Sequence, residues 1–90
     1  MEARARVPSR FFGISIWVYW RDHPPPHFHA EYGEHDAEVG IEDLVVLGGN
    51  LPPRALGLVI EWATRHHDEL RRVWDRAANH EPLTSIEPLR

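Results

Sequence analysis

The clearest pattern in the chain is an alternation of apolar and other residues between positions 10 and 20. Alternation over this length predicts a β-strand with one face turned to a core. The residues of even number form the predicted core face, and they are Phe12, Ile14, Ile16, Val18 and Trp20. The other face is not fully polar, because Trp17 and Tyr19 lie on it beside Gly13 and Ser15.

Two more alternating segments, at 27–32 and 35–41, are separated only by Gly33 and Glu34. Glycine readily takes the positive φ that a type II′ turn needs at its first central position, so this pair predicts a tight hairpin. In that register apolar residues face apolar ones and polar residues face polar ones. The facing pairs are Tyr32 with His35, Glu31 with Asp36, Ala30 with Ala37, His29 with Glu38, and Phe28 with Val39. A shift by one residue would mix the two faces.

The second half of the chain predicts one more strand and a helix. The apolar run at 44–47 predicts a fourth strand, which Gly48-Gly49-Asn50 is expected to end. From about 53 to 79 apolar residues recur every three or four positions, which predicts one helix of roughly 40 Å with a single apolar stripe. The stripe and the even-numbered strand residues define the predicted core: Phe12, Ile14, Ile16, Val18, Phe28, Val39, Ile41, Leu56, Ile60, Ala63, Leu70 and Trp74.

These segments predict a single α+β domain over residues 10–80. Its architecture is a three- to four-stranded antiparallel meander packed against one long C-terminal helix, with extended termini. Residues 1–9 are expected to form a flexible tail. The last segment, 81–90, contains two prolines, which exclude a regular helix. Either Leu83, Ile86 and Leu89 pin this arm to the domain, or the segment is a partly ordered tail.

Composition and charge narrow the classes of function. The chain contains no cysteine, so disulfides and thiolate metal sites are excluded. No apolar run approaches the roughly 20 residues that span a bilayer, and no signal peptide is evident, so we expect a cytoplasmic protein with no membrane contact. The formal net charge is −4 at pH 7. Half of the arginines lie on the predicted helix among acidic residues, which argues against general DNA binding.

Histidines give the chain its main candidate chemistry. His27 and His29 are two apart on a predicted strand, so their side chains leave the same face at a spacing that suits chelation. Glu38 is expected directly opposite His29. The sequence therefore predicts a candidate Zn²⁺ or Mn²⁺ site at His27, His29 and Glu38, with His23 and Glu31 as further possible ligands. The alternative is an ordinary polar pair on an outer sheet face.

Other candidates leave alternatives open. His29 and Glu38 could share a proton and act in acid–base catalysis without a metal. His66 on the helix either stacks beside Trp62 or faces the loop near His23, while His35 and His80 are expected at the surface. Trp17 and Tyr19 form either a partner-binding patch or a face covered by the helix or the arm. Candidate catalytic residues are thus His29, Glu38 and His66.

The run Asp22-His23-Pro24-Pro25-Pro26-His27-Phe28-His29 is the most distinctive segment. Further motifs follow in a characteristic order: Tyr32-Gly33, Leu51-Pro52-Pro53-Arg54, Glu61-Trp62, His66, Leu70, Trp74 and Ile86-Glu87-Pro88-Leu89. Over about residues 10–90 the chain resembles the domain of unknown function 4160 family. This resemblance implies a prokaryotic protein without an established activity. It also implies a gene beside another small gene, an arrangement that has suggested toxin–antitoxin modules.

Two functions follow as expectations. The first is a partner-binding component of a two-gene, toxin–antitoxin-like module, whose partner is another small protein encoded nearby. The second is a metal-dependent hydrolase or nuclease that uses the histidine and glutamate cluster. Homo-oligomerisation through the histidine face is a third possibility. Neither a phosphate-binding glycine loop nor a nucleophile motif is present to favour another enzyme class.

Overall fold

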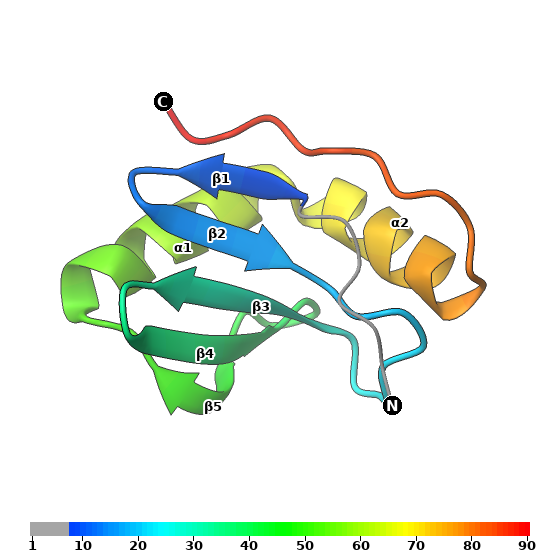
Figure 1. Ribbon diagram of the computed structural model, residues 1–90, viewed down its shortest axis with the longest axis horizontal. Coiled ribbons are helices and arrows are strands. Elements are labelled where there is room, and N and C mark those ends of the chain that lie inside the picture. Colours follow the sequence, from blue (N-terminus) through cyan, green and yellow to red (C-terminus); the bar gives the residue numbers. More distant parts are fainter. Residues whose placement is uncertain (1–7) are drawn as a thin grey trace.

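Five antiparallel strands form one sheet in the computed structural model, which describes residues 8–90, and two helices lie against one face of this sheet (Figure 1). The strands pair in chain order and are β1 (Ser9–Phe11), β2 (Ile14–Trp17), β3 (His27–Tyr32), β4 (His35–Gly40) and β5 (Val46–Asn50). The helices are α1 (Pro53–Arg65) and α2 (His67–Ala78). The α+β class and the antiparallel meander are confirmed, with five strands instead of three or four and two helices instead of one.

The segment predicted as one strand at 10–20 contains a tight turn. Phe12 and Gly13 connect β1 to β2, and both have positive φ, at 48° and 79°. This is the backbone of a type I′ turn, and it reverses which parity faces the core. Phe11 is therefore buried, and the prediction that Phe12 is a core residue is wrong, because its side chain is 58% exposed. Residues 1–7 of the predicted tail lie outside the described residues, while Ser9 already belongs to β1.

The β3–β4 hairpin has the predicted register along its whole length. Tyr32 faces His35 next to the turn, and Phe28 faces Val39 near the other end. Gly33 has φ +61°, as the first central position of a type II′ turn requires. The register is correct because both faces constrain it: Phe28 and Val39 are wholly buried on the core side.

The fourth predicted strand, at 44–47, differs in its bounds from β5. Gly48 and Gly49 continue the strand instead of ending it, because β4 lies very close to them. A Cβ atom on Gly49 would lie 2.3 Å from the carbonyl oxygen of Asp36, and Gly49 also has φ +69°. Gly49 allows close approach to the β4 backbone near a bulge that lies between Glu38 and Val39, and a short apolar run followed by two glycines does not reveal this role.

Substitutions of Gly57 and Gly49 by alanine are therefore expected to have opposite effects on stability. Gly57→Ala, inside α1 where an added Cβ meets nothing within 4 Å, is expected to raise the free energy of unfolding by about 0.5–1 kcal/mol. Gly49→Ala is expected to lower it by more than about 2 kcal/mol, because the new methyl overlaps the β4 backbone. Urea denaturation of both variants checks the pair, and equal effects would contradict the close approach at Gly49.

The single predicted helix is broken at His66, which has φ −119° and ψ 29°. A straight helix of roughly 40 Å would overhang a protein whose longest extent is 33 Å. The break redirects α2 along the sheet. His67, the first residue of α2, bonds the carbonyl oxygen of Ile41 through its Nε2 at 2.5 Å. This contact crosses 26 positions, so local periodicity cannot predict it.

The core lies between the sheet and the helices. Eight of the predicted core residues are buried: Ile14, Ile16, Val18, Phe28, Val39, Ile41, Ala63 and Leu70. Leu56, Ile60 and Trp74 are half-buried against them. No helix among residues 8–90 is long and apolar enough to cross a membrane.

The C-terminal arm is pinned to the domain, which decides between the two alternatives for this segment. Leu83, Ile86 and Leu89 are buried in the core cluster. The backbone N–H of Ile86 donates to the carbonyl of Pro8, and the arm runs beside β1 (Figure 1). The edge of the sheet formed by β1 is therefore covered.

Candidate functional site

The proline-rich loop between β2 and β3 folds back over the start of β3. Within this loop, Arg21 donates its backbone N–H to the carbonyl of Ala77 on α2 at 3.2 Å. Its last residue, Pro26, accepts a hydrogen bond from the N–H of Ile41 at 2.9 Å. Three consecutive prolines restrict the chain between these anchors. The loop thereby holds Asp22 against the strand that carries His27 and His29.

Three side chains converge at this point. Oδ2 of Asp22 lies 2.9 Å from Nε2 of His27 and 3.2 Å from Nε2 of His29. The three ligand atoms all lie within 4.8 Å of one another. The side chains are 5%, 6% and 14% exposed for Asp22, His27 and His29, so the group is largely withdrawn from solvent. We refer to Asp22, His27 and His29 as the Asp–His cluster.

His27 has a second contact that constrains its protonation. Its Nδ1 lies 2.7 Å from the carbonyl oxygen of Pro25. A carbonyl oxygen only accepts hydrogen bonds, so Nδ1 must carry the proton. In a neutral His27, Nε2 therefore carries a lone pair and accepts hydrogen bonds. It faces the Asp22 carboxylate, which in its ionised form also only accepts, so the two atoms would repel each other. The contact is favourable if a second proton makes His27 cationic, or if a metal ion lies beside both atoms.

Two of the three distances between the ligand atoms suit a metal ion. Two atoms bonded to one ion at about 2.0–2.1 Å, with an angle of 90–109°, lie roughly 2.8–3.4 Å apart. Both distances from Asp22 Oδ2 fall in that range, whereas the two imidazole ligand atoms lie within 4.8 Å of each other and would have to move closer to share one ion. Metal-binding histidines usually donate their other ring N–H to a carbonyl or carboxylate, as His27 does to Pro25. Two imidazoles and a carboxylate are a donor set for Zn²⁺ or Mn²⁺.

Aromatic side chains fix both imidazoles. Trp17 stacks on His29, with ring centroids 5.5 Å apart and planes inclined by 14°, and Tyr19 meets the same ring edge-on at 4.8 Å. Trp74 of α2 lies 5.2 Å from the ring of His27. The imidazoles are therefore held by packing before any ligand binds, which lowers the entropy cost of binding.

The cluster opens into a hollow of about 350 Å³, which we call the histidine hollow. Besides the cluster and its aromatic wall, His23, Asp36 and Glu38 line it. His23 is mostly exposed and lies 3.7 Å from Asp22. Three carboxylates around one hollow produce a negative potential, which favours a bound cation.

The predicted site residues divide into two groups. His27 and His29 do converge, as period-two spacing on a strand predicts, and Glu38 lies opposite His29 in the register. Glu38 lines the hollow but is not part of the cluster: a Cβ on Gly48 would lie 3.9 Å from its Oε2, so the carboxylate lies over β5. Glu31 is exposed and does not line the hollow. The third side chain of the cluster is Asp22 instead.

Asp22 is the residue that sequence reasoning missed. It precedes His27 by five positions, and three of the four residues between them are prolines. Strand periodicity gives no information on where such a loop places its side chains. The usable signal is chemical: Asp22 is the one carboxylate in the loop that leads directly into the histidine pair.

The remaining candidates have clear positions. Nδ1 of His66 lies 2.6 Å from Oε1 of Glu69, and its ring packs beside Trp62, so His66 belongs to the helix junction and does not line the histidine hollow. Of the two alternatives for Trp17, an exposed partner-binding patch or a covered face, the structure shows a covered side chain, which is 6% exposed and forms a wall of the hollow. Tyr19 is half-buried, and His35 and His80 are exposed.

Comparison with known proteins gives one match. A family model described as Domain of unknown function (DUF4160) matches residues 13–75, which is most of the chain and includes the whole Asp–His cluster. No curated protein and no solved structure is significantly similar to the chain.

Proposed function

Because the chain belongs to the DUF4160 family, whose description assigns no activity, we propose a function from the site itself: the protein is a metal-dependent hydrolase. The observation that supports this proposal is the double contact of His27. One ring nitrogen bonds the carbonyl of Pro25, and the other meets the oxygen of Asp22 that also faces His29. A metal ion would satisfy all three ligand atoms at once; without one, His29 donates its Nε2–H to Asp22 and the contact of His27 needs one added proton on its ring.

Three protein ligands indicate a catalytic type of site. Structural zinc sites are closed by four protein ligands, whereas catalytic ones keep a position for water. A divalent ion held by Asp22, His27 and His29 would supply a bound water that loses its proton near neutral pH. The histidine hollow gives a substrate access to that position.

Glu38 is the carboxylate in the hollow that lies opposite His29 in the sheet register, and we assign it the uptake of that proton. It lies across from His29 on β4, it is exposed, and it lines the hollow without belonging to the cluster. A carboxylate near a metal-bound water acts as a general base in hydrolysis. We therefore assign binding to the Asp–His cluster and proton transfer to Glu38.

A hydrolysis assay with matched variants tests the proposal. We expect Zn²⁺- or Mn²⁺-loaded protein to hydrolyse members of a panel of nitrophenyl esters, phosphate esters and peptide anilides. Glu38→Gln is expected to lower kcat by roughly 10²–10⁴-fold without loss of bound metal. Glu31→Gln, an exposed carboxylate outside the hollow, is the control and should retain wild-type rates.

The results of this assay distinguish the assigned mechanism from the hydrolase activity itself. Turnover that is equal with and without metal, or equal in Glu38→Gln, would contradict the assigned mechanism. Bound metal without turnover on any substrate class would contradict the hydrolase and leave a metal-binding protein.

A second proposal is the partner-binding role in a two-gene module, and a specific observation favours it. Phe12 and Tyr32 are 58% and 40% exposed and line one cavity. Exposed aromatic side chains around a hollow are typical of a binding hot spot. Co-expression with the product of the neighbouring small gene, followed by co-purification, tests this role. Failure to co-purify would contradict it without affecting the metal site.

A further inference from the structure

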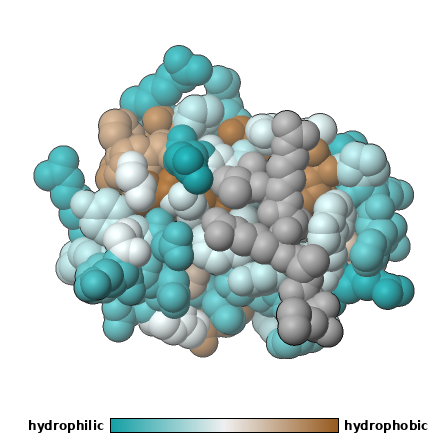
Figure 2. Space-filling model, in the orientation of Figure 1, coloured by the Kyte–Doolittle hydropathy of each residue, from teal (hydrophilic) through white to brown (hydrophobic). Residues whose placement is uncertain are grey.

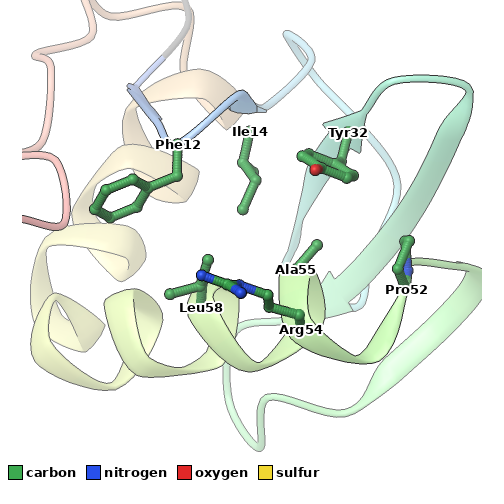
Figure 3. Close-up of a pocket in the computed structure, with 7 residues that line it drawn as sticks. All are labelled: Phe12, Ile14, Tyr32, Pro52, Arg54, Ala55 and Leu58. Atoms are coloured by element: carbon green, nitrogen blue, oxygen red, sulfur yellow. The ribbon is translucent and has the colours of Figure 1, made fainter.

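A second hollow lies far from the Asp–His cluster, between the β1–β2 turn, the end of β3 and the first turns of α1 (Figure 3). We call it the aromatic groove and define it by Phe12, Ile14, Tyr32, Arg54, Ala55 and Leu58. Its volume is about 390 Å³. Tyr32 and His27 are at opposite ends of β3, so roughly 16 Å of strand separates the groove from the cluster.

Phe12 is held in the groove wall by a backbone conformation that suits it poorly. Its φ is +48°, in the left-handed region that glycine and asparagine adopt far more easily. Asparagine followed by glycine is the preferred pair for such a turn. Burial does not offset this strain, because the ring is 58% exposed. Backbone strain of this kind is concentrated at functional sites, and the ring's contact with Phe11, at 6.5 Å between centroids, leaves much of it open to a partner.

The charged side chain that lines the groove is positive. Arg54 is its single charged lining residue, and Figure 3 shows its side chain extending along α1 toward Leu58, beneath Phe12. Within residues 8–90 no carboxylate pairs with Arg54, as is also true of Arg10, Arg21, Arg72 and Arg76, whereas Arg65, Arg71 and Arg90 each have an acidic partner. The groove therefore offers apolar walls and one available cation, which complements an apolar group beside an acidic one.

The shape of the groove favours a protein segment over a small molecule. Small-molecule sites enclose most of their ligand, but here the two aromatic walls are largely exposed. Figure 2 shows an apolar patch over the β1–β2 turn, at upper left, on a face that is otherwise mostly polar. Aromatic rims with one arginine are the usual composition of a protein-binding hot spot.

We propose that the aromatic groove binds a segment of a partner protein in which a bulky apolar side chain lies next to an acidic residue. The apolar side chain fills the space between Phe12, Tyr32 and Leu58, and the carboxylate pairs with Arg54. This inference deepens the second proposed role, partner binding, and is independent of the metal site.

The test uses a randomised peptide library displayed on phage and selected against the full-length protein. We expect the enriched peptides to carry an aromatic or large aliphatic residue beside Asp or Glu. Phe12→Asn should weaken binding of a synthetic enriched peptide by at least about tenfold. The same variant should melt at or above the wild-type temperature, because asparagine suits the turn better. Arg54→Glu should also weaken binding, and it should fold, since an acidic residue is favourable in the first turn of a helix.

A control variant and a test with the neighbouring gene's product accompany the peptide selection. Arg72→Glu, an exposed arginine outside the groove, should bind the peptide like wild type. No enrichment, or enriched peptides that bind Phe12→Asn equally well, would overturn the inference. Self-association that Phe12→Asn abolishes would overturn it in favour of a second copy of this chain. If the neighbouring gene's product co-purifies equally with wild type and Phe12→Asn, partner binding stands and the groove is not its site.

Discussion

Replacing Asp22 with asparagine is expected to lower the affinity for Zn²⁺ by at least about 100-fold. Removing a residue that only hydrogen-bonds to a metal ligand lowers metal affinity by roughly 10–100-fold. Asp22 supplies a ligand atom itself, together with the negative charge of the cluster, so its loss should cost more. Isothermal titration calorimetry gives the affinity. Co²⁺ provides a second readout, because its visible absorption reports an ion bound by nitrogen and oxygen ligands independently of any activity.

The matched control for Asp22→Asn is Asp36→Asn. Asp36 also lines the histidine hollow, but it lies outside the Asp–His cluster, so its loss should change Zn²⁺ affinity only slightly. His27→Ala/His29→Ala should abolish binding, and melting curves of all variants establish that they are folded. Equal affinities in Asp22→Asn and Asp36→Asn would mean that the hollow attracts cations only through its overall charge. If the wild-type protein does not bind Zn²⁺, the short contact between Asp22 and His27 is explained by a proton on His27 and not by a metal ion.

The parts of the fold that sequence predicts well are those under two independent constraints. In the β3–β4 hairpin the turn chemistry of Gly33 and the burial of Phe28 and Val39 require the same register, and that register is found. The break at His66 has no such local signal. It lies beside the hydrogen bond from His67 to the carbonyl of Ile41, a contact that exists only once helix and sheet have met.

In the candidate site, too, the residues on a regular strand were predicted and the residue placed by long-range contacts was not. Period-two spacing places His27 and His29 on one face because both lie on a regular strand. It also placed Glu38 beside them, and the carboxylate is in the same hollow but outside the cluster. Asp22 was not predicted, because the path of a proline-rich loop is decided by its anchors on Ala77 and Ile41. Exposure is equally difficult to predict, as the buried Trp17 and the exposed Phe12 demonstrate.

Trp62→Ala is expected to lower the free energy of unfolding by about 3–5 kcal/mol, the typical cost of removing a large buried ring. Trp62 is wholly buried and packs against Phe11 and Phe28, with ring centroids 5.5 and 5.9 Å away. Domains of this kind have a total stability of about 5–15 kcal/mol, so this loss removes a large share. The melting temperature should fall by more than about 12 °C, which differential scanning calorimetry measures.

Trp62 also joins the core to the C-terminal arm, and a second variant separates these two roles. Its Nε1–H donates to the carbonyl oxygen of Glu87 at 2.9 Å, across 25 positions of the chain. Trp62→Phe keeps much of the ring but loses this hydrogen bond, so it should cost about 1–2 kcal/mol and increase amide exchange at Ile86 and Leu89. Phe12→Ala, at an exposed ring, is the control and should cost less than about 1 kcal/mol. If Trp62→Phe leaves exchange in the arm unchanged, the burial of Ile86 and Leu89 alone holds the arm in place, and the hydrogen bond contributes little to it.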